Sequence, residues 1–257
     1  MSDTDAAAKK VTWDYTEHAA HYDNRADYSD TSISEVLKAT QCSPGTVVAD
    51  IGAGTGKLTK LLLAHGLVVR AVEPNDAMRG FGIKNTVGNP VSWTVGTGEE
   101  TGLPDHSAHC AFFGSSFNVV NQRAALVEVS RIVRPKGYFV CMWNHRDLSD
   151  PLQDSIERAI KQNISGYGYG LRREDPTDVI AQSGLFQPSK ATQGAFAVEM
   201  SADAVIDAWK SHATVKRQSE TPERFAEIIR NIEDLVNARG RTVVVPYVTR
   251  IWSARLK

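Results

Sequence analysis

One glycine-rich turn constrains the fold of this chain more than any other feature of the sequence. A short apolar run at residues 46–51 leads directly into Gly-Ala-Gly-Thr-Gly at residues 52–56, and leucines at helical spacing follow it. Glycine permits the close backbone approach that such a turn needs. A strand, turn and helix in this order predict an open α/β sheet and bring a helix N-terminus close to a ligand. A tight turn without a ligand is the alternative interpretation.

The same alternation of short apolar runs and helical patterns continues beyond the turn. Strands separated by helices predict a Rossmann-like, doubly wound and mostly parallel sheet. We expect seven strands, an antiparallel C-terminal strand and a helical cap. The predicted strands lie at residues 46–51, 68–72, 91–95, 111–113 and 138–143, with antiparallel strands in 242–256, and the clearest predicted helices lie at 58–63, 76–81, 124–132, 202–209 and 222–238.

Charge, apolar runs and cysteine spacing argue against several classes of partner. The chain carries 29 Lys and Arg against 30 Asp and Glu, so its net charge does not favour nucleic acid or an anionic membrane. The first ten residues are polar, and no run of about 18 apolar residues follows. The three cysteines lie far apart, and the histidines show no metal-ligand spacing. We therefore expect a cytoplasmic protein with reduced cysteines, no metal, and no membrane or nucleic-acid partner.

Two nucleotide cofactors compete for a glycine turn of this kind, and the spacing separates them. A dinucleotide-binding turn needs G-x-G-x-x-G, whereas this chain reads G-x-G-x-G and has Lys57 where the third glycine would stand. A P-loop needs a Lys-Ser or Lys-Thr pair, which the turn lacks. Glu73 ends the second predicted strand, near the surface, where its carboxylate can accept hydrogen bonds from ribose hydroxyls. This pattern fits an adenosine ligand and disfavours NAD(P).

At these residues the chain resembles the class I S-adenosylmethionine-dependent methyltransferases. Their first motif is an acidic residue, an apolar residue and then G-x-G-x-G, and Asp50 and Ile51 supply the first two positions here. The resemblance covers roughly residues 12–147. It is strongest to the small-molecule "type 11" group, through Gly96-Thr97-Gly98-Glu99 with Leu103-Pro104, through Arg131-Ile132-Val133-Arg134-Pro135-Lys136-Gly137, and through Trp143-Asn144 with Arg146-Asp147.

The resemblance implies S-adenosylmethionine as the cofactor and assigns its contacts position by position. The methionine part would lie against Gly52, Ala53, Gly54 and Thr55 and against Gly114 and Ser115 after the fourth strand. The ribose would lie on Glu73, and the adenine would be lined by Pro74, Asn75 and Met78 and met at its edge by Thr97, Gly98 and Glu99. Asp50 is expected to order the loop rather than to bind the cofactor.

A helix before the first strand closes over the site in such enzymes, and Tyr22-x-x-Arg25-x-x-Tyr28 resembles that lid. Either Arg25 or Tyr22 is expected to hold the methionine carboxylate. A surface helix with core aromatic residues is the alternative interpretation of the same segment.

The chain departs from the family pattern after the fourth strand. Many relatives carry Ala-Phe-His-Trp-Phe there, whereas residues 115–119 read Ser-Ser-Phe-Asn-Val, so no catalytic histidine carries over to this position. Methyl transfer from a sulfonium is an in-line displacement that positioning and desolvation accelerate, and a base is needed only for a protonated acceptor. His145, just past the fifth predicted strand, is the candidate base. A satisfied surface histidine is the alternative.

We therefore expect a methyltransferase that acts on the O, N or C atom of a small molecule, as a monomer or homodimer. The alternatives are a cofactor-binding protein repurposed for a non-methyl step such as cyclisation and, less favoured, an NAD(P)-dependent oxidoreductase. Residues 1–257 are expected to form a single domain. Its expected parts are lid helices at 1–40, the cofactor-binding core at 46–147, the cap and acceptor-pocket segment at 150–240, and C-terminal strands at 242–257.

Overall fold

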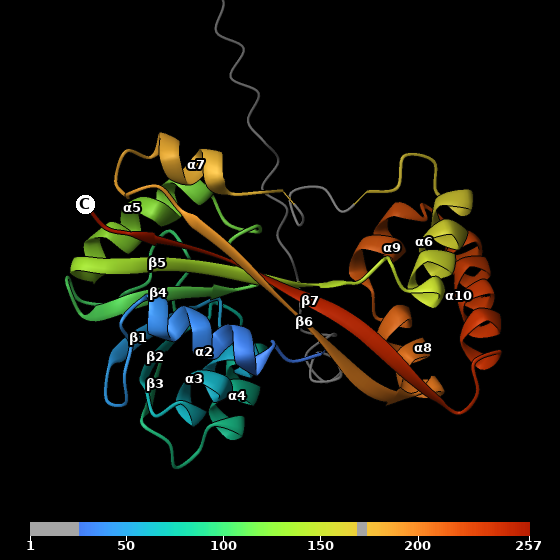
Figure 1. Ribbon diagram of the computed structural model, residues 1–257, viewed down its shortest axis with the longest axis horizontal. Helices are drawn as coiled ribbons and strands as arrows, with labels where there is room; N and C mark the ends of the chain where they lie inside the picture. The colour runs from blue at the N-terminus through green and yellow to red at the C-terminus, as the bar shows by residue number, and fades with distance from the viewer. Residues whose placement is uncertain (1–25, 169–173) are drawn as a thin grey trace, which may run out of the picture.

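The computed structural model describes residues 26–168 and 174–257, in which helices cover both faces of a sheet that continues into a helical cap (Figure 1). The strands are β1 (Val47–Ile51), β2 (Val68–Val72), β3 (Val91–Thr94), β4 (Ala108–Gly114), β5 (Val133–Arg146), β6 (Lys190–Ser201) and β7 (Thr242–Arg255). The helices are α2 (Asp30–Ala39), α3 (Lys57–Ala64), α4 (Asp76–Asn85), α5 (Gln122–Ile132), α6 (Pro151–Asn163), α7 (Thr177–Gln182), α8 (Ala202–Lys210), α9 (Ala213–Gln218) and α10 (Pro222–Asn237).

The strand order confirms the predicted doubly wound sheet. The seven strands lie in the order β3-β2-β1-β4-β5-β7-β6. Strands β1 to β5 are parallel, and β7 runs antiparallel between β5 and β6. The order reverses between β1 and β4, and in open α/β sheets ligands bind beyond the carboxyl ends of the strands at such a point. The glycine turn after β1 lies at that edge.

The sheet is buried on both faces because two sets of helices cover it. Residues of β4 alternate between the two faces, as strand geometry requires. Phe112 lies in the core beneath α2 and α3, with Ile33 and Leu62. Its neighbour Phe113 lies in the opposite core, beneath α5, with Leu126. A central strand covered on both sides needs the nearly continuous apolar run that β4 has.

The strands near the C-terminus differ from the prediction. Residues 242–257 contain one long strand, β7, where we expected several. β7 pairs with β5 from Tyr138↔Arg255 to Arg146↔Tyr247, and this pairing extends β5 well beyond residue 143. Strand β6, which pairs with β7 along its whole length, was not predicted.

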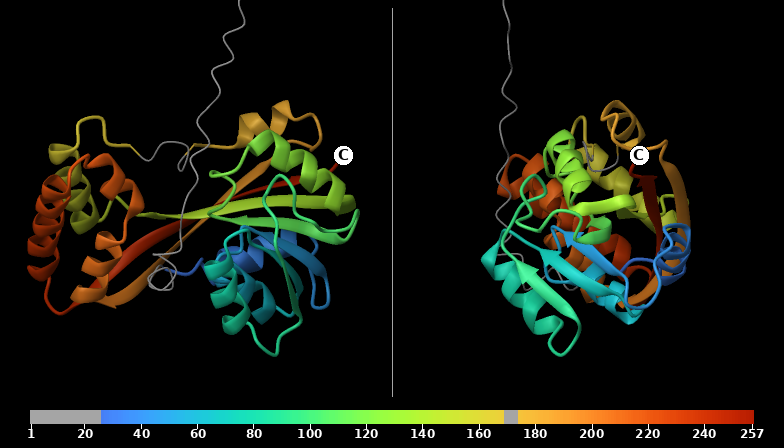
Figure 2. Two further views of the ribbon diagram at one scale, coloured as in Figure 1. Left: turned by 180° about the vertical axis from the view of Figure 1, so that it is seen from behind. Right: turned by 90° about the vertical axis from the view of Figure 1, so that its left-hand side faces the viewer.

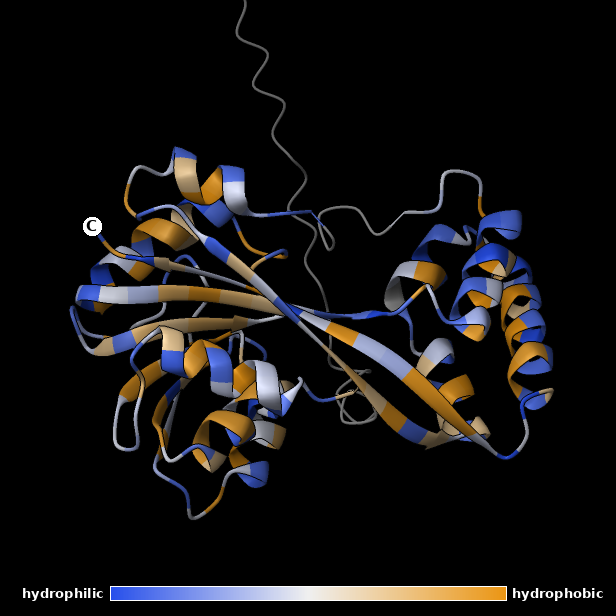
Figure 3. Ribbon diagram, viewed as in Figure 1, coloured by the Kyte–Doolittle hydropathy of each residue, from blue (hydrophilic) through white to orange (hydrophobic). Residues whose placement is uncertain are grey.

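A separate core holds the cap together. Helices α6, α8, α9 and α10 pack around the distal parts of β6 and β7, which leave the sheet as a long ribbon (Figures 1 and 2). Trp209 and Ile228 are buried there in the same cluster as Val245 and Tyr247 of β7. In Figure 3 the cap helices carry apolar and polar bands, as amphipathic helices do. No helix within residues 26–168 and 174–257 is both long and apolar enough to cross a bilayer.

Residues 150–240 do not form one continuous cap segment, contrary to expectation. After α6 the chain returns to the sheet, where α7 packs near α5 (Figure 1). Ile180 and Phe186 are buried there in the same core as Phe139 of β5. Only after β6 does the chain re-enter the cap. The apolar side chains of α7 help to cover one face of the sheet, and this burial explains why the chain returns to the sheet between α6 and β6.

Candidate active site

The glycine turn between β1 and α3 needs glycine for two reasons. Gly52, Gly54 and Gly56 have φ angles of 69°, 60° and 86°, in the left-handed region that glycine favours. A Cβ atom on Gly52 would also lie 2.5 Å from Cβ of Ser116. Any side chain there would therefore push the turn away from the loop that follows β4.

Glu73 follows β2, and its carboxylate holds the turn. Oε2 accepts a hydrogen bond from the backbone N–H of Gly54, and Oε1 accepts one from that of Asn75, each at 2.9 Å. The side chain is only 7% exposed, so the expectation of a surface position is wrong. Burial raises the pKa of the carboxyl above its usual value, although the two N–H groups act in the opposite direction. Each oxygen keeps a second lone-pair direction in which a ribose hydroxyl could donate.

Asp50 links β1 to α3 beneath the turn. Its Oδ2 accepts a hydrogen bond from Thr59 Oγ1 at 2.6 Å, and the carboxyl is fully buried. Burial raises the pKa of Asp50 to about 7, and the neighbouring carboxylate of Glu73 adds to the rise. This hydrogen bond fixes the end of β1 to α3 next to the turn, and the loop-ordering role stays a prediction.

The loop after β2 lies beside the turn. Asn75 caps α4, because its Oδ1 accepts the N–H of Met78 at 3.0 Å. The Met78 side chain is buried, and its Cε would lie 3.3 Å from a Cβ atom on Gly54. Pro74, which precedes the cap, is exposed. The three residues expected to line the adenine thus lie in the segment directly after Glu73, and Met78 at its end reaches the glycine turn.

The loop after β3 is anchored to α5. Thr97 closes a turn, because its N–H donates to the carbonyl of Glu100 at 2.8 Å and its Oγ1 accepts from the N–H of Glu100 at 3.1 Å. Glu99 Oε1 accepts the N–H of Asn121, the N-cap of α5, at 2.7 Å. Gly98 packs closely on Val120. One oxygen of Glu99 is therefore already engaged with the helix.

Tyr28 lies over the carboxyl end of β4. Its hydroxyl is 2.9 Å from Ser115 Oγ, and it would be 3.1 Å from a Cβ atom on Gly114. Ser115 itself has a left-handed φ of 58°. Of the expected lid residues, Tyr28 thus contacts the site, whereas Tyr22 and Arg25 lie outside the described residues.

Three side chains that the sequence analysis did not assign hold the segment next to Tyr28. Lys57 Nζ donates to Asp27 Oδ1 at 2.9 Å, and Asn144 Nδ2 donates to the carbonyl of Asp27 at 2.8 Å. Thr249 Oγ1 donates to Asn144 Oδ1 at 2.7 Å and accepts the N–H of Ser29 at 3.0 Å. In the sequence, Lys57 was notable only because it replaces the third glycine of a dinucleotide-binding turn. No sequence pattern indicated a role for Thr249.

His145 lies within β5 and not just past it, contrary to prediction. Pairing with β7 carries β5 through Arg146, and His145 pairs with Val248. Its side chain is 9% exposed and packs edge-on to Trp143, with the ring centroids 6.4 Å apart. Gly114 at the end of β4 pairs with Met142, so His145 stands three residues, about 10 Å, beyond that end. It therefore lies where β5 leaves the parallel sheet and runs towards the cap.

The comparisons with known proteins agree with this geometry. A family model described as a methyltransferase domain matches residues 49–141, from β1 to β5. The chain is 28% identical over 207 residues to an uncharacterised methyltransferase of Mycobacterium tuberculosis, covering 79% of this chain and 80% of that protein. It is 27% identical over 179 residues to a ubiquinone/menaquinone biosynthesis C-methyltransferase of a Caulobacter species, covering 62% and 69%.

Among solved structures, a putative type II methyltransferase from Anaeromyxobacter dehalogenans matches with a TM-score of 0.63 at 20% identity. The match covers 90% of this chain and 97% of that one. This structural likeness shows the fold, and the family model and the sequence relatives show the kind of enzyme. The chain matches a methyltransferase domain at residues 49–141 and is similar to methyltransferases over most of its length.

Proposed function

We propose that the enzyme transfers the methyl group of S-adenosylmethionine to a small-molecule acceptor that enters between the carboxyl edge of the sheet and the cap. The observation that carries the proposal is the buried carboxylate of Glu73, which accepts N–H groups from both the glycine turn and the loop that starts α4. It thereby draws together the turn that would contact the methionine part of the cofactor and the loop that would line its adenine. The balanced charge of the chain favours a small molecule over a polyanion.

The residues at this edge fit the cofactor. Gly52 and Gly54 carry no side chain, so the backbone of the turn can approach the cofactor closely. The turn leads into the N-terminus of α3, where backbone N–H groups favour a carboxylate. Glu73 offers acceptors for ribose hydroxyls, and Met78 offers an apolar surface for the adenine. Ser115 and Tyr28 would border the methionine part, with Tyr22 or Arg25 as its further contacts.

When bound, the cofactor supplies a methyl group made electrophilic by its sulfonium. The chain itself has to place the acceptor atom in line with that group and to exclude water. Tyr28 covers the end of β4 through its contact with Ser115. Asn144 fixes the neighbouring segment by its hydrogen bond to Asp27. These contacts support a site that is closed over the methionine end of the cofactor.

His145 is the proposed base where the acceptor carries a proton. Its place on the projecting part of β5, between the cofactor edge and the cap, supports this role. Arg146 next to it lies 4.0 Å over the ring of Trp209 in α8, which ties this part of β5 to the cap. An acceptor bound between the two parts would therefore pass close to His145.

Two measurements test the proposed function. Calorimetric titration should detect binding of S-adenosylhomocysteine and none of NAD(P). Incubation with methyl-labelled S-adenosylmethionine and a metabolite extract should give a product heavier by one methyl group, together with S-adenosylhomocysteine. Turnover of a metabolite without consumption of the cofactor would instead establish a non-methyl reaction, and binding of NAD(P) alone would overturn the proposal.

A further inference from the structure

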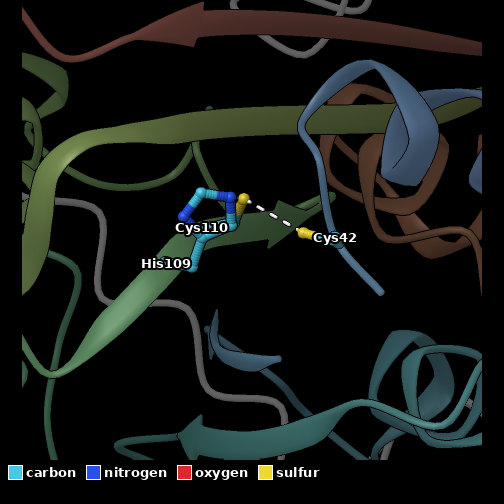
Figure 4. A group of neighbouring side chains, drawn as sticks. All are labelled: Cys42, His109 and Cys110. Atoms are coloured by element: carbon cyan, nitrogen blue, oxygen red, sulfur yellow. Dashed lines mark hydrogen bonds between the residues drawn. The ribbon is translucent and has the colours of Figure 1, made fainter. Parts of the chain in front are cut away.

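Two thiols face each other at the opposite edge of the sheet from the cofactor site. Cys110 lies in β4 and pairs with Val48 in β1, four residues before Gly114 at the carboxyl end. Cys42 lies in the loop between α2 and β1. Their Sγ atoms are 3.3 Å apart, as the dashed line in Figure 4 marks. Cys110 is fully buried, whereas Cys42 is partly exposed.

The surroundings make the two thiols unequal. The hydrogen bond with Cys110, a second one from Thr40 Oγ1 and the positive charge of Arg134 lower the pKa of the Cys42 thiol, although burial opposes them. Burial raises the pKa of Cys110 well above its usual value. Cys42 is therefore the thiol that ionises, and Cys110 keeps its proton and donates it towards Cys42. The partly exposed member of the pair is thus also the more nucleophilic one.

His109 next to the thiols completes a group that resembles a metal site. The candidate ligand atoms of Cys42, His109 and Cys110 all lie within 4.8 Å of one another. However, both ring nitrogens of His109 are engaged. Arg134 Nε can only donate, so Nδ1 accepts a hydrogen bond from it at 2.9 Å and Nε2 donates one to the carbonyl of Thr40 at 2.7 Å. This arrangement leaves no lone pair on His109 for a metal and puts a guanidinium beside it.

We propose that Cys42 and Cys110 form a reversible disulfide when a low-molecular-weight disulfide oxidises the pair. A bonded pair of sulfur atoms lies about 2.0 Å apart, so the two sulfurs have to approach by little more than an ångström. Cys42 stands in the loop between α2 and β1, outside any helix or strand, so closing this gap needs only a small shift of that loop. The proposal does not depend on the identity of the methyl acceptor.

The reaction proceeds by two thiol–disulfide exchanges. The Cys42 thiolate attacks one sulfur of the oxidant and releases the other as a thiolate. Cys110 then gives up its proton and attacks the Cys42 sulfur, which releases the second thiolate. The protein loses two electrons and two protons, and the oxidant is reduced to two thiols. The new bond ties the end of α2 to β4.

Equilibration of the full chain in glutathione redox buffers, followed by acid quenching, alkylation and non-reducing mass spectrometry, tests the proposal. We expect loss of two hydrogens, protection of two of the three thiols, and a peptide that links Cys42 to Cys110 while Cys141 is alkylated. Cys141→Ser should behave as the wild type. Cys42→Ser and Cys110→Ala should both lack the linked peptide, and Cys42→Ser, in a partly exposed loop, keeps the test valid if Cys110→Ala does not fold.

Three results would overturn the inference. The first is full alkylation of all three thiols across the redox series, and the second is a linkage through Cys141. The third is stoichiometric retention of Zn²⁺ after dialysis with protection of both thiols, which would assign the group to a metal. Arg134→Gln supplies a further check, because loss of its charge should slow the oxidation of Cys42 several-fold. Affinity for S-adenosylhomocysteine should be equal in the reduced and oxidised forms, since the pair lies at the other edge of the sheet.

Discussion

The carboxylate of Glu73 accepts the backbone N–H of Gly54 at 2.9 Å, so the residue expected to hold the ribose also holds the glycine turn. Its other oxygen binds the N–H of Asn75 at the start of α4. The two roles share one buried side chain, and a substitution cannot remove one without the other.

Glu73→Ala should therefore weaken both cofactor binding and folding. Loss of two charge-assisted hydrogen bonds to the ribose, each of about 1.5 to 3 kcal/mol and partly coupled, predicts roughly hundredfold weaker binding of S-adenosylhomocysteine. The N–H groups of Gly54 and Asn75 lose their buried acceptor, which predicts a fall of about 1 to 3 kcal/mol in the free energy of unfolding. Calorimetry and urea unfolding measure the two effects.

Two further variants serve as controls. Glu73→Gln keeps one carbonyl acceptor and should retain part of the affinity, whereas Glu35→Ala on the exposed side of α2 should change neither quantity. Affinity of folded Glu73→Ala within about threefold of the wild type would contradict the ribose role.

Asp50→Asn should remove a pH dependence of stability. The folded protein raises the pKa of Asp50 from 3.8 to about 7, so between these values it binds more protons than the unfolded chain. Stability from this group is therefore present below pH 4 and is lost as the pH rises towards 7, at up to about 1.4 kcal/mol per pH unit. Urea unfolding from pH 4 to 8 should show a smaller decline for Asp50→Asn. Parallel curves for the two proteins would show that Asp50 is ionised throughout.

The parallel half of the sheet was predictable because its signals are local. Short apolar runs alternate with helical patterns from residue 46 to residue 143. Each strand in this part can be recognised from its own apolar residues, without knowledge of its partner strands. Strand β6 was missed because residues 190–201 are mostly small or polar, and only Phe196, Val198 and Met200 alternate as a half-buried strand does. The length of β5 was missed because its partner β7 lies about a hundred residues away in the chain.

Predictions for the site were limited in the same way. The glycine turn and Glu73 are recognisable from spacing, since they lie within one strand–helix–strand unit. The contacts of Thr249 with Asn144 and Ser29 join three segments that are far apart in the sequence. No local pattern in any of these segments predicts the contacts. The burial of Glu73 likewise depends on how closely the turn and α4 approach it.

The N-terminal segment should be protected from hydrogen exchange when the cofactor binds. Hydrogen exchange of residues 13–28 should slow in saturating S-adenosylhomocysteine, because Tyr22 and Arg25 are expected to close over the methionine part. Thr249→Val removes the partner of the Ser29 N–H and of Asn144 Oδ1, so it should reduce this protection and lower the free energy of unfolding by about 1 to 3 kcal/mol. Thr192→Val on the exposed face of β6 is the matched control. Unchanged exchange in the wild-type protein would contradict the lid.

The last prediction concerns His145 as the base. A base that takes a proton from the acceptor typically accelerates the step by about 10² to 10⁴, so His145→Ala should lower kcat by that order and remove the acidic limb of its pH profile. Affinity for S-adenosylhomocysteine should be unchanged, because His145 stands three residues beyond the end of β4. His65→Ala, which breaks only the surface pair with Asp30, is the control and should keep the wild-type profile. With the true acceptor, a wild-type rate for His145→Ala across the whole pH range would remove this residue from the mechanism and leave positioning alone to drive the displacement.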